Sequence, residues 1–308
     1  MRERILAVVG AIGLIAGAFF LRSVIAGDDS TADGPDGSNG RQNAGAPVVA
    51  CERDLQAVCD ALVEAGTITA APSLTLSGAA ADDLTVDGWI TWDPAPGIAN
   101  FDRPDTWGAT EALASAPLGV LTFDGTSECG PTSTWLACVV AGAEQGVPVG
   151  VGSGTTAQSL ARLHPIAGSL VPDEGDYTQV NASTLRRVID SPQGGQSDYV
   201  DQIRTFITTS GALSIVVGPV PALEVAPTSP RLAGRNAAVH TLTPAAEITV
   251  VIATRQSSSD TPPVAADALL GDPAVEAVFT ELGLTPGTGT VSDQRQAGEV
   301  YAIRDKVT

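Results

Sequence analysis

Residues 152–156 read Gly-Ser-Gly-Thr-Thr and stand between an apolar run that starts at Val147 and a helical pattern that ends at Leu163. Such a turn collects backbone N–H groups at the positive end of a helix dipole, where a carboxylate, an oxyanion or a polar ligand atom is favoured. An ordinary turn between a strand and a helix uses the same residue types, because Gly fits a tight turn and Ser or Thr caps a helix. Both interpretations stay open from this stretch alone.

Catalytic motifs are not supported at this turn. A nucleophile elbow at Ser153 needs glycines where Val151 and Thr155 stand. A P-loop needs Gly-Lys and then Ser or Thr, and no such sequence follows the turn. We therefore predict that the chain is not an enzyme. An extracytoplasmic hydrolase is kept as an alternative, because the acidic pairs at 82–83 and 173–174 could form a glycosidase-like pair, although both resemble solvated turns.

The four cysteines form two close pairs, Cys51 with Cys59 and Cys129 with Cys138. Neither pair has the C-x-x-C spacing of a zinc site, and the two histidines fall in no ligand pattern, so we predict no metal and no cofactor. An even number of cysteines in an exported chain favours disulfides. Three pairings are possible in principle. We favour the two local ones over four buried free thiols.

Length and composition describe a globular chain with room for two domains. The sequence has 308 residues, of which 44% are hydrophobic and 17% are charged. Its formal net charge is -19. A chain this acidic is repelled by phosphate backbones, so nucleic acid is excluded as a partner.

The first residues predict export. Arg2 and Arg4 precede an apolar run over residues 5–21, which is the order of a signal anchor or signal peptide with its N-terminus inside. We expect residues 1–26 to form a retained membrane anchor or a cleaved signal, and residues 27–46, rich in Gly, Asp, Ser and Asn, to be a flexible linker. Either outcome places the remaining chain in an extracytoplasmic location.

Strand and helix patterns alternate from residue 47 onwards, which predicts an α/β protein with mostly parallel sheets. The expected strands are residues 47–50, 67–70, 86–92, 117–123, 147–151, 213–217, 238–241 and 247–253. The expected helices are residues 53–65, 77–84, 134–142, 157–163, 181–189, 199–208, 273–282 and 294–303.

The order of these pieces resembles the type 2 periplasmic binding protein (extracellular solute-binding protein) superfamily, and especially its molybdate-binding-like branch. The pieces that carry the resemblance are the first strand and helix at 48–62, Leu76-Ser77-Gly78 opening a helix, the Asp-containing strand at 87–91, the turn at Gly152, the capped helix at Ser183 and the strand that ends at Gly218-Pro219. The resemblance covers residues 47 to about 307, and each of its motifs is short.

The resemblance implies two α/β lobes that face each other across a cleft, with the chain crossing between them twice. Residues 47–145 and about 220–308 would form the first lobe, and residues 146–219 the second. Residues 142–146 and 218–230 would be the hinges.

The resemblance also implies that the ligand lies at the carboxyl ends of the strands and at helix N-termini. The candidate ligand-binding residues are Glu52, Arg53, Ser77, Gly78, Thr91, Trp92, Ser127, Ser153, Gly154, Thr155 and Thr156. Each has a structural alternative: Ser77 and Ser153 could be helix caps, Arg53 could pair with Glu52 or Asp54 on the surface, and the tryptophan could pack in the core.

The function that the resemblance implies is an extracytoplasmic solute-binding protein that captures a small polar or anionic ligand between its lobes. Its partners would be that ligand and the permease of an ABC-type importer, with anchorage in the cytoplasmic membrane. The alternative is a membrane-anchored cell-envelope interaction module that keeps the fold and binds no ligand.

Overall fold

The computed structural model describes residues 45–81, 83–125, 129–172, 176–190, 198–256 and 265–308. The described residues belong to one compact unit. The expected anchor at 1–26 and nearly all of the expected linker lie outside the described residues, so both stay predictions. Within the described ranges, no helix combines the length and apolar character that crossing a membrane requires.

The first sheet, which we call sheet A, begins with parallel strands. β1 (Val48–Cys51) pairs in parallel with β2 (Thr69–Ala70) and with β3 (Gly88–Trp92). β3 then pairs antiparallel with β8 (Glu247–Arg255), whose partner on the other side is β4. Because β1 and β3 are parallel neighbours, the residues that follow them emerge at the same edge of the sheet.

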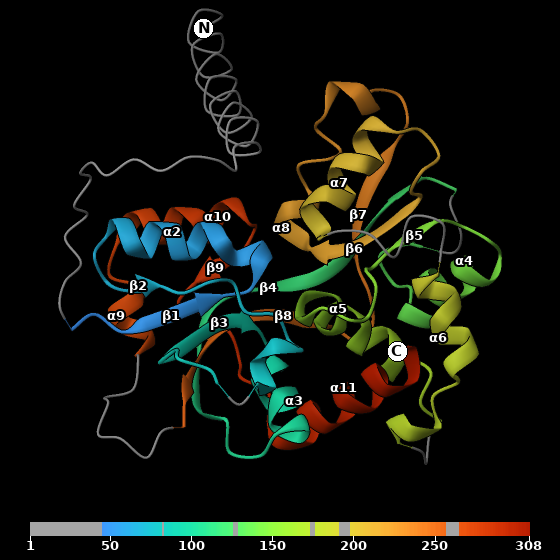
Figure 1. Ribbon diagram of the computed structural model, residues 1–308. Coiled ribbons are helices and arrows are strands. Elements are labelled where there is room, and N and C mark those ends of the chain that lie inside the picture. The colour runs from blue at the N-terminus through green and yellow to red at the C-terminus, as the bar shows by residue number, and fades with distance from the viewer. Residues whose placement is uncertain (1–44, 82, 126–128, 173–175, 191–197, 257–264) are drawn as a thin grey trace, which may run out of the picture. The chain divides into compact units, whose positions relative to one another are not determined.

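A single long strand joins sheet A to a second sheet, sheet B. β4 (Trp107–Phe123) pairs with β8 and β9 (Thr285–Pro286) as far as Pro117, and from Leu118 onwards it pairs with β6 (Ile215–Pro219) and β7 (Ala237–Thr241). β5 (Val149–Gly150) completes sheet B beside β6. Figure 1 shows β4 running between the two groups of strands. We call sheet A with its helices the first lobe and sheet B with its helices the second lobe.

The expectation of mostly parallel sheets is wrong for the described strands. Parallel pairing occurs only for β1 with β2, β1 with β3 and β5 with β6, whereas β4 is antiparallel to all of its partners. The reason is the connection between the lobes: β4 leaves sheet A and the chain returns through β7 and β8 in the opposite direction. Hydrophobic periodicity reports which residues are buried and carries no information on strand direction.

The helices of the first lobe cover sheet A. They are the 3₁₀ turn η1 (Arg53–Leu55), α2 (Gln56–Glu64), the 3₁₀ turn η2 (Gly78–Ala80), α3 (Ala95–Asp102), α9 (Ala266–Leu269) and α10 (Pro273–Glu281). α2 forms as expected because Val58 and Leu62 share one buried face. The expected helix at 77–84 shortens to η2, and Ala81 already has an extended backbone.

The second lobe packs its helices around sheet B. They are the π-helical turn η3 (Leu136–Val140), α4 (Ala141–Glu144), α5 (Ala157–Gly168), the 3₁₀ turn η4 (Tyr177–Gln179), α6 (Ala182–Ile189), α7 (Tyr199–Thr208), α8 (Val220–Leu223) and the 3₁₀ turn η5 (Pro230–Leu232). The last helix, α11 (Gln294–Val307), contacts α3 of the first lobe and α5 and α6 of the second.

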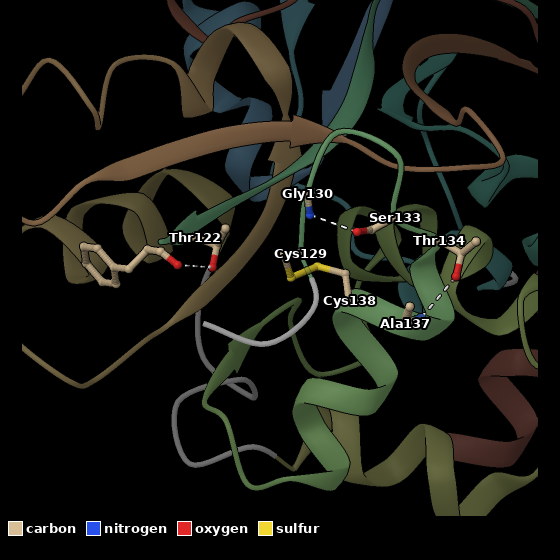
Figure 2. Close-up of a disulfide and its surroundings, with 8 residues drawn as sticks. Thr122, Cys129, Gly130, Ser133, Thr134, Ala137 and Cys138 are labelled. Atoms are coloured by element: carbon tan, nitrogen blue, oxygen red, sulfur yellow. Dashed lines mark hydrogen bonds between the residues drawn. A yellow bond between two sulfur atoms is a disulfide. The ribbon is translucent and has the colours of Figure 1, made fainter. Parts of the chain in front are cut away.

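Two disulfides connect the cysteines in the local pairs that the sequence favours. Cys51 at the end of β1 is bonded to Cys59 in α2, and Cys129 is bonded to Cys138 in η3. Figure 2 shows the second disulfide beside the turn in which the Gly130 N–H donates to Ser133 Oγ at 2.9 Å. The first disulfide brackets Glu52 and η1, so it fixes the backbone that presents the acidic residues described next.

Candidate functional site

Polar side chains follow the two parallel strands of sheet A at the edge that faces the second lobe. Glu52 comes directly after β1, and Thr91 lies near the end of β3. Thr91 Oγ1 donates to Glu52 Oε2 at 3.0 Å, and both side chains are buried, with Glu52 5% exposed. Buried polar groups need such partners, because an unpaired carboxylate in the interior costs several kcal/mol, about the loss of a strong hydrogen bond.

Asp54 connects the same edge to the other lobe. Trp92, the last residue of β3, donates from Nε1 to Asp54 Oδ2 at 2.8 Å. The same oxygen accepts from Nε2 of Gln158, in the first turn of α5, at 2.5 Å. One carboxylate oxygen therefore joins η1, β3 and α5, three elements that are far apart in the sequence.

The N-terminus of α5 receives the second carboxylate. Thr156 caps this helix by accepting from the Ser159 N–H at 3.2 Å, and the Ser159 hydroxyl completes a capping box. Ala157, the first residue of α5, supplies a backbone hydrogen bond that lowers the pKa of the Glu52 carboxyl. The helix end that the sequence predicts to attract an anion thus contacts an acidic side chain of the chain itself, and the helix dipole favours the ionised form of that acid.

A buried arginine holds α5 in this position. Arg162 is 0% exposed and donates from Nη1 to Gln202 Oε1 at 2.8 Å and to the Val217 carbonyl of β6 at 3.0 Å. Its Nη2 donates to Gln158 Oε1 at 3.1 Å, and that oxygen also accepts from the Tyr199 N–H at 3.1 Å. The amide of Gln158 is consequently oriented with its NH₂ group towards Asp54.

We call this group the polar interlobe contact. It comprises the side chains of Glu52, Asp54, Thr91, Trp92, Gln158 and Arg162 and the N–H of Ala157. Two of its buried atoms, Oδ1 of Asp54 and Nε of Arg162, have no hydrogen bond to another described residue. The Tyr199 ring lies beside it, 6.1 Å from the Trp92 ring in an edge-on arrangement.

Burial perturbs the acids of the contact. It raises the pKa of Glu52 to about 8, and the neighbouring charge of Asp54 adds to the rise, while the hydrogen bonds from Thr91 and Ala157 oppose it. Burial also raises the pKa of Asp54 to about 6. The hydrogen bond from Trp92 lowers this pKa, the charge of Asp198 raises it, and the charge of Arg162 lowers it. Removal of Arg162 from water lowers its pKa to about 10, against the attraction of nearby acids. At neutral pH, Glu52 is therefore largely protonated and Arg162 is charged.

A cavity of about 450 Å³ lies along the remaining part of α5, and we call it the α5 cavity. Ala161, His164 and Gly168 form its α5 wall, and the other walls include Asp93 after β3 and the connection 244–247 between β7 and β8. Ser292 donates to Asp93 Oδ2 from its N–H at 3.0 Å and also from its hydroxyl. Burial raises the pKa of Asp93, against these two hydrogen bonds.

The α5 cavity also has one histidine in its wall. His164 Nε2 is 3.2 Å from Glu299 Oε2 of α11, and the imidazole stacks on Tyr177 with 5.4 Å between ring centres. Burial lowers the pKa of His164, and Glu299 opposes this. Among the described residues, no group of three or more His, Cys, Asp or Glu side chains is placed to hold a metal ion.

The structure brings some of the predicted site residues together and separates others. Glu52, Thr91 and Trp92 meet in the polar interlobe contact, and Thr156 caps the helix that enters it. Three predicted residues lie in the turn before α5: Ser153 and Thr155, whose hydroxyl oxygens are 2.7 Å apart, and Gly154, whose φ is 72°. Arg53 and Ser77 are exposed, and the Ser77 Oγ lies 3.2 Å from Thr75 Oγ1. Gly78 begins η2. Ser127 lies outside the described residues.

Sequence reasoning missed Asp54, Gln158, Arg162 and Tyr199. A signal existed for two of them: Gln158 and Arg162 are four residues apart in a largely apolar helix, so both share one face of α5. Polar residues at that spacing on a buried face need partners, and they indicate a polar contact. No sequence signal pairs them with Asp54, which is more than a hundred residues away.

No protein-family model matches the chain, and no curated protein sequence does either. Solved structures do match in fold. A periplasmic thiamin binding protein has a TM-score of 0.56 at 12% identity, over 90% of this chain and 100% of its own. The apo ferric ion-binding protein A of Pasteurella haemolytica has a TM-score of 0.54 at 11% identity, over 86% of this chain and 95% of its own.

A third solved structure is the periplasmic binding protein AfuA from Actinobacillus pleuropneumoniae, with exogenous fructose-6-phosphate bound. It has a TM-score of 0.54 at 10% identity, over 85% of this chain and 95% of its own. The chain thus has the two-lobe fold of type 2 periplasmic binding proteins, as its sequence predicts. At these identities the likeness concerns the fold, and the molybdate-binding-like branch stays a prediction.

Proposed function

From the two-lobe fold of type 2 periplasmic binding proteins, we propose that this protein is an extracytoplasmic solute-binding protein that holds a small polar solute between its lobes. The observation that carries the proposal is the polar interlobe contact. Side chains at the carboxyl ends of β1 and β3 reach the N-terminal turn of a helix from the opposite lobe; Glu52, Thr91 and Gln158 are buried there, and Asp54 is partly buried. Ligand sites in α/β proteins concentrate at such strand ends and domain interfaces.

Solute entry requires the lobes to separate. The chain crosses between the sheets within β4, after Pro117, and again between Thr241 and Glu247. We place the hinge at these two crossings, because residues 118–123 and 237–241 pair within sheet B and therefore belong to the second lobe. This placement replaces the hinges expected at residues 142–146 and 218–230 and the lobe boundaries expected at 145 and 219. Rotation there would pull Asp54 from Gln158 and expose both to water and solute.

The described arrangement corresponds to closed lobes in this proposal. Gln158 and Arg162 remain bonded to each other and to the second lobe, whereas Glu52, Asp54 and Thr91 belong to the first. A solute that bonds to both sets favours closure by its difference in affinity for the closed and open states. The structural likeness to periplasmic binding proteins supports transport by an ABC-type importer, an extracytoplasmic location and a non-enzymatic role.

The second candidate is a cell-envelope interaction module that binds no solute. One observation favours it: the polar groups of the two lobes largely satisfy each other within the contact. Such a module would gain stability from permanent closure. It would not use the hinge.

Thermal unfolding of the purified protein with oxyanions, amino acids, sugars and amines tests the two candidates. A solute that binds only the folded protein raises the melting temperature, and a concentration of about 100 Kd adds about 2.7 kcal/mol of stability. We expect a shift for at least one class of solute, and Gln158→Ala should abolish it. The absence of any shift in all four classes would favour the interaction module.

A further inference from the structure

Acidic side chains outnumber basic ones in and beside the polar interlobe contact. The neighbours of Glu52 are Asp54 of η1, Thr91 of β3 and the N–H of Ala157 in α5. The neighbours of Asp54 are Trp92 of β3, Gln158 and Arg162 of α5, and Asp198 and Tyr199 at the start of α7. Among the groups that shift these two acids, Arg162 is the cation; it lowers the pKa of Asp54, which Asp198 raises.

Arg162 is not free to grip an anionic solute. Both of its Nη atoms are bonded, one to Gln202 and Val217 and the other to Gln158. Recognition of a carboxylate or phosphate usually uses a pair of N–H groups, and here both Nη atoms are engaged within the second lobe, so the buried Nε cannot form such a pair without breaking one of these bonds. The α5 N-terminus is engaged as well, because its Ala157 N–H donates to Glu52.

The contact leaves one buried atom on each side without a hydrogen bond to another described residue, Nε of Arg162 among the donors and Oδ1 of Asp54 among the acceptors. Oδ1 of Asp54 is buried without a hydrogen bond to another described residue, while Oδ2 accepts two. The rings of Trp92 and Tyr199 stand next to this carboxylate, 6.1 Å apart. A carboxylate beside aromatic rings in a desolvated site is an arrangement that attracts a cation with N–H donors.

Building on the proposed function, we propose that the solute held between the lobes is a small organic cation with N–H donors, an amine or guanidine, and that Asp54 is its principal acceptor. The donors of the cation would bond to Asp54 Oδ1 and to the Glu52 carboxylate. No described group of three metal-binding side chains is available, which favours an organic cation over a metal ion.

Cation binding at this contact is linked to protons. Glu52, with a pKa of about 8, and Asp54, with a pKa of about 6, are partly protonated near neutral pH, and a bound cation favours their ionised forms. Binding must then release protons and strengthen as the pH rises from 6 to 8. We expect affinity to rise about tenfold over this range, since one pKa unit is about a factor of ten in an equilibrium constant.

Three probes of matched length test the proposal on the full protein: 1,4-diaminobutane, 1,4-butanediol and succinate. Calorimetric titration at pH 6 and pH 8, in two buffers of different ionisation enthalpy, gives affinity and proton release together. We expect the diamine to bind with proton release, and the diol and the dicarboxylate not to bind. Asp54→Asn should weaken diamine binding at least tenfold, whereas Asp60→Asn, on the exposed side of α2, should leave it unchanged.

The Asp54→Asn variant keeps a side-chain oxygen that can accept the Trp92 hydrogen bond, so it removes the charge with little change in packing. Glu52→Gln is the second variant, used if Asp54→Asn fails to fold. Binding of the diol or succinate in place of the diamine would overturn the cation assignment and leave the solute-binding proposal standing. Diamine binding that is equal in wild type and Asp54→Asn would also overturn the assignment. If none of the three probes binds while a solute of another class raises the melting temperature, the cation assignment falls and the solute-binding proposal stands; if no solute of any class raises it, the proposed function falls as well.

Discussion

Two stretches of the same helix face the first lobe in different ways. At the polar interlobe contact, Gln158 and Arg162 are both buried; Gln158 donates to Asp54 of the other lobe, and Arg162 holds Gln158 from within the second lobe. Along the α5 cavity, Ala161 and His164 border about 450 Å³ of open space. The first stretch therefore determines how strongly the lobes hold together and how this depends on pH, whereas the second should tolerate change.

The largest expected effect is the loss of the buried guanidinium. Arg162→Met removes the donors that hold Gln158, Gln202 and the Val217 carbonyl, and it leaves nearby carboxylates without a counter-charge. Breaking one side of a buried ionic network typically costs about 3–5 kcal/mol of unfolding free energy. Urea denaturation measures this loss.

Arg295→Met is the matched control, because the Arg295 side chain is 85% exposed and pairs with Glu299 within α11. It should change the unfolding free energy by about 1 kcal/mol or less. A similar small loss for Arg162→Met would contradict the idea that the polar interlobe contact holds the lobes.

The next effect is a dependence of stability on pH. Because the pKa of Glu52 is raised from its ordinary value of 4.5 to about 8 on folding, folding binds a proton, and stability present below pH 4.5 is lost as the pH rises to about 8. Each pKa unit corresponds to about 1.4 kcal/mol, so the loss is on the order of a few kcal/mol. Glu52→Gln should flatten the unfolding free energy between pH 5 and pH 8. An unchanged slope in this variant would show that Glu52 is not the titrating group.

A pair of identical substitutions compares the two stretches directly. Ala157 is 2% exposed at the packed end of α5, and Ala161 borders the α5 cavity. Ala157→Leu overpacks the interface and should cost about 1–3 kcal/mol. Ala161→Leu can place its added carbons in the cavity and should cost about 1 kcal/mol at most. Equal losses in thermal or urea unfolding would remove the distinction between the two stretches.

The smallest expected effect concerns the ion pair in the cavity wall. Glu299→Gln removes the charge beside His164, and because the imidazole is partly exposed the loss should be about 0–1 kcal/mol. Glu299 opposes the burial that lowers the pKa of His164, so the variant should lower this pKa further. Titration by NMR measures the shift, and a rise in the pKa would contradict the described geometry.

Local patterns predicted much of the fold. Both disulfides, most helices and the acidic edge after β1 follow from spacing, burial periodicity and caps. The first half of β4 was missed because its residues are small or polar, and pairing with β8 is what makes it a strand. α3 was missed because it contains Pro96 and Gly97; the glycine is needed there, since a Cβ would lie 2.5 Å from that of Ala297 in α11.

The candidate site was predicted in part for the same reason. Glu52 follows an expected strand, and Thr91 and Trp92 end another, so the strand pattern together with the family resemblance was enough to name them. Gln158 and Arg162 acquire their meaning only from groups of the other lobe, and pairings of this kind depend on how the lobes fold together. Arg53 and Ser77 stand near the same strand ends, yet their side chains are exposed.

Hydrogen exchange at the Ala157 amide tests the central claim most directly, because this N–H bonds to Glu52 only while the lobes are closed. We predict that the probe giving the largest melting-temperature shift slows exchange of this amide at least tenfold. The amide of Val251, inside sheet A, serves as the internal reference and should change much less. Unchanged exchange at Ala157 with the probe bound would contradict a solute held between the lobes.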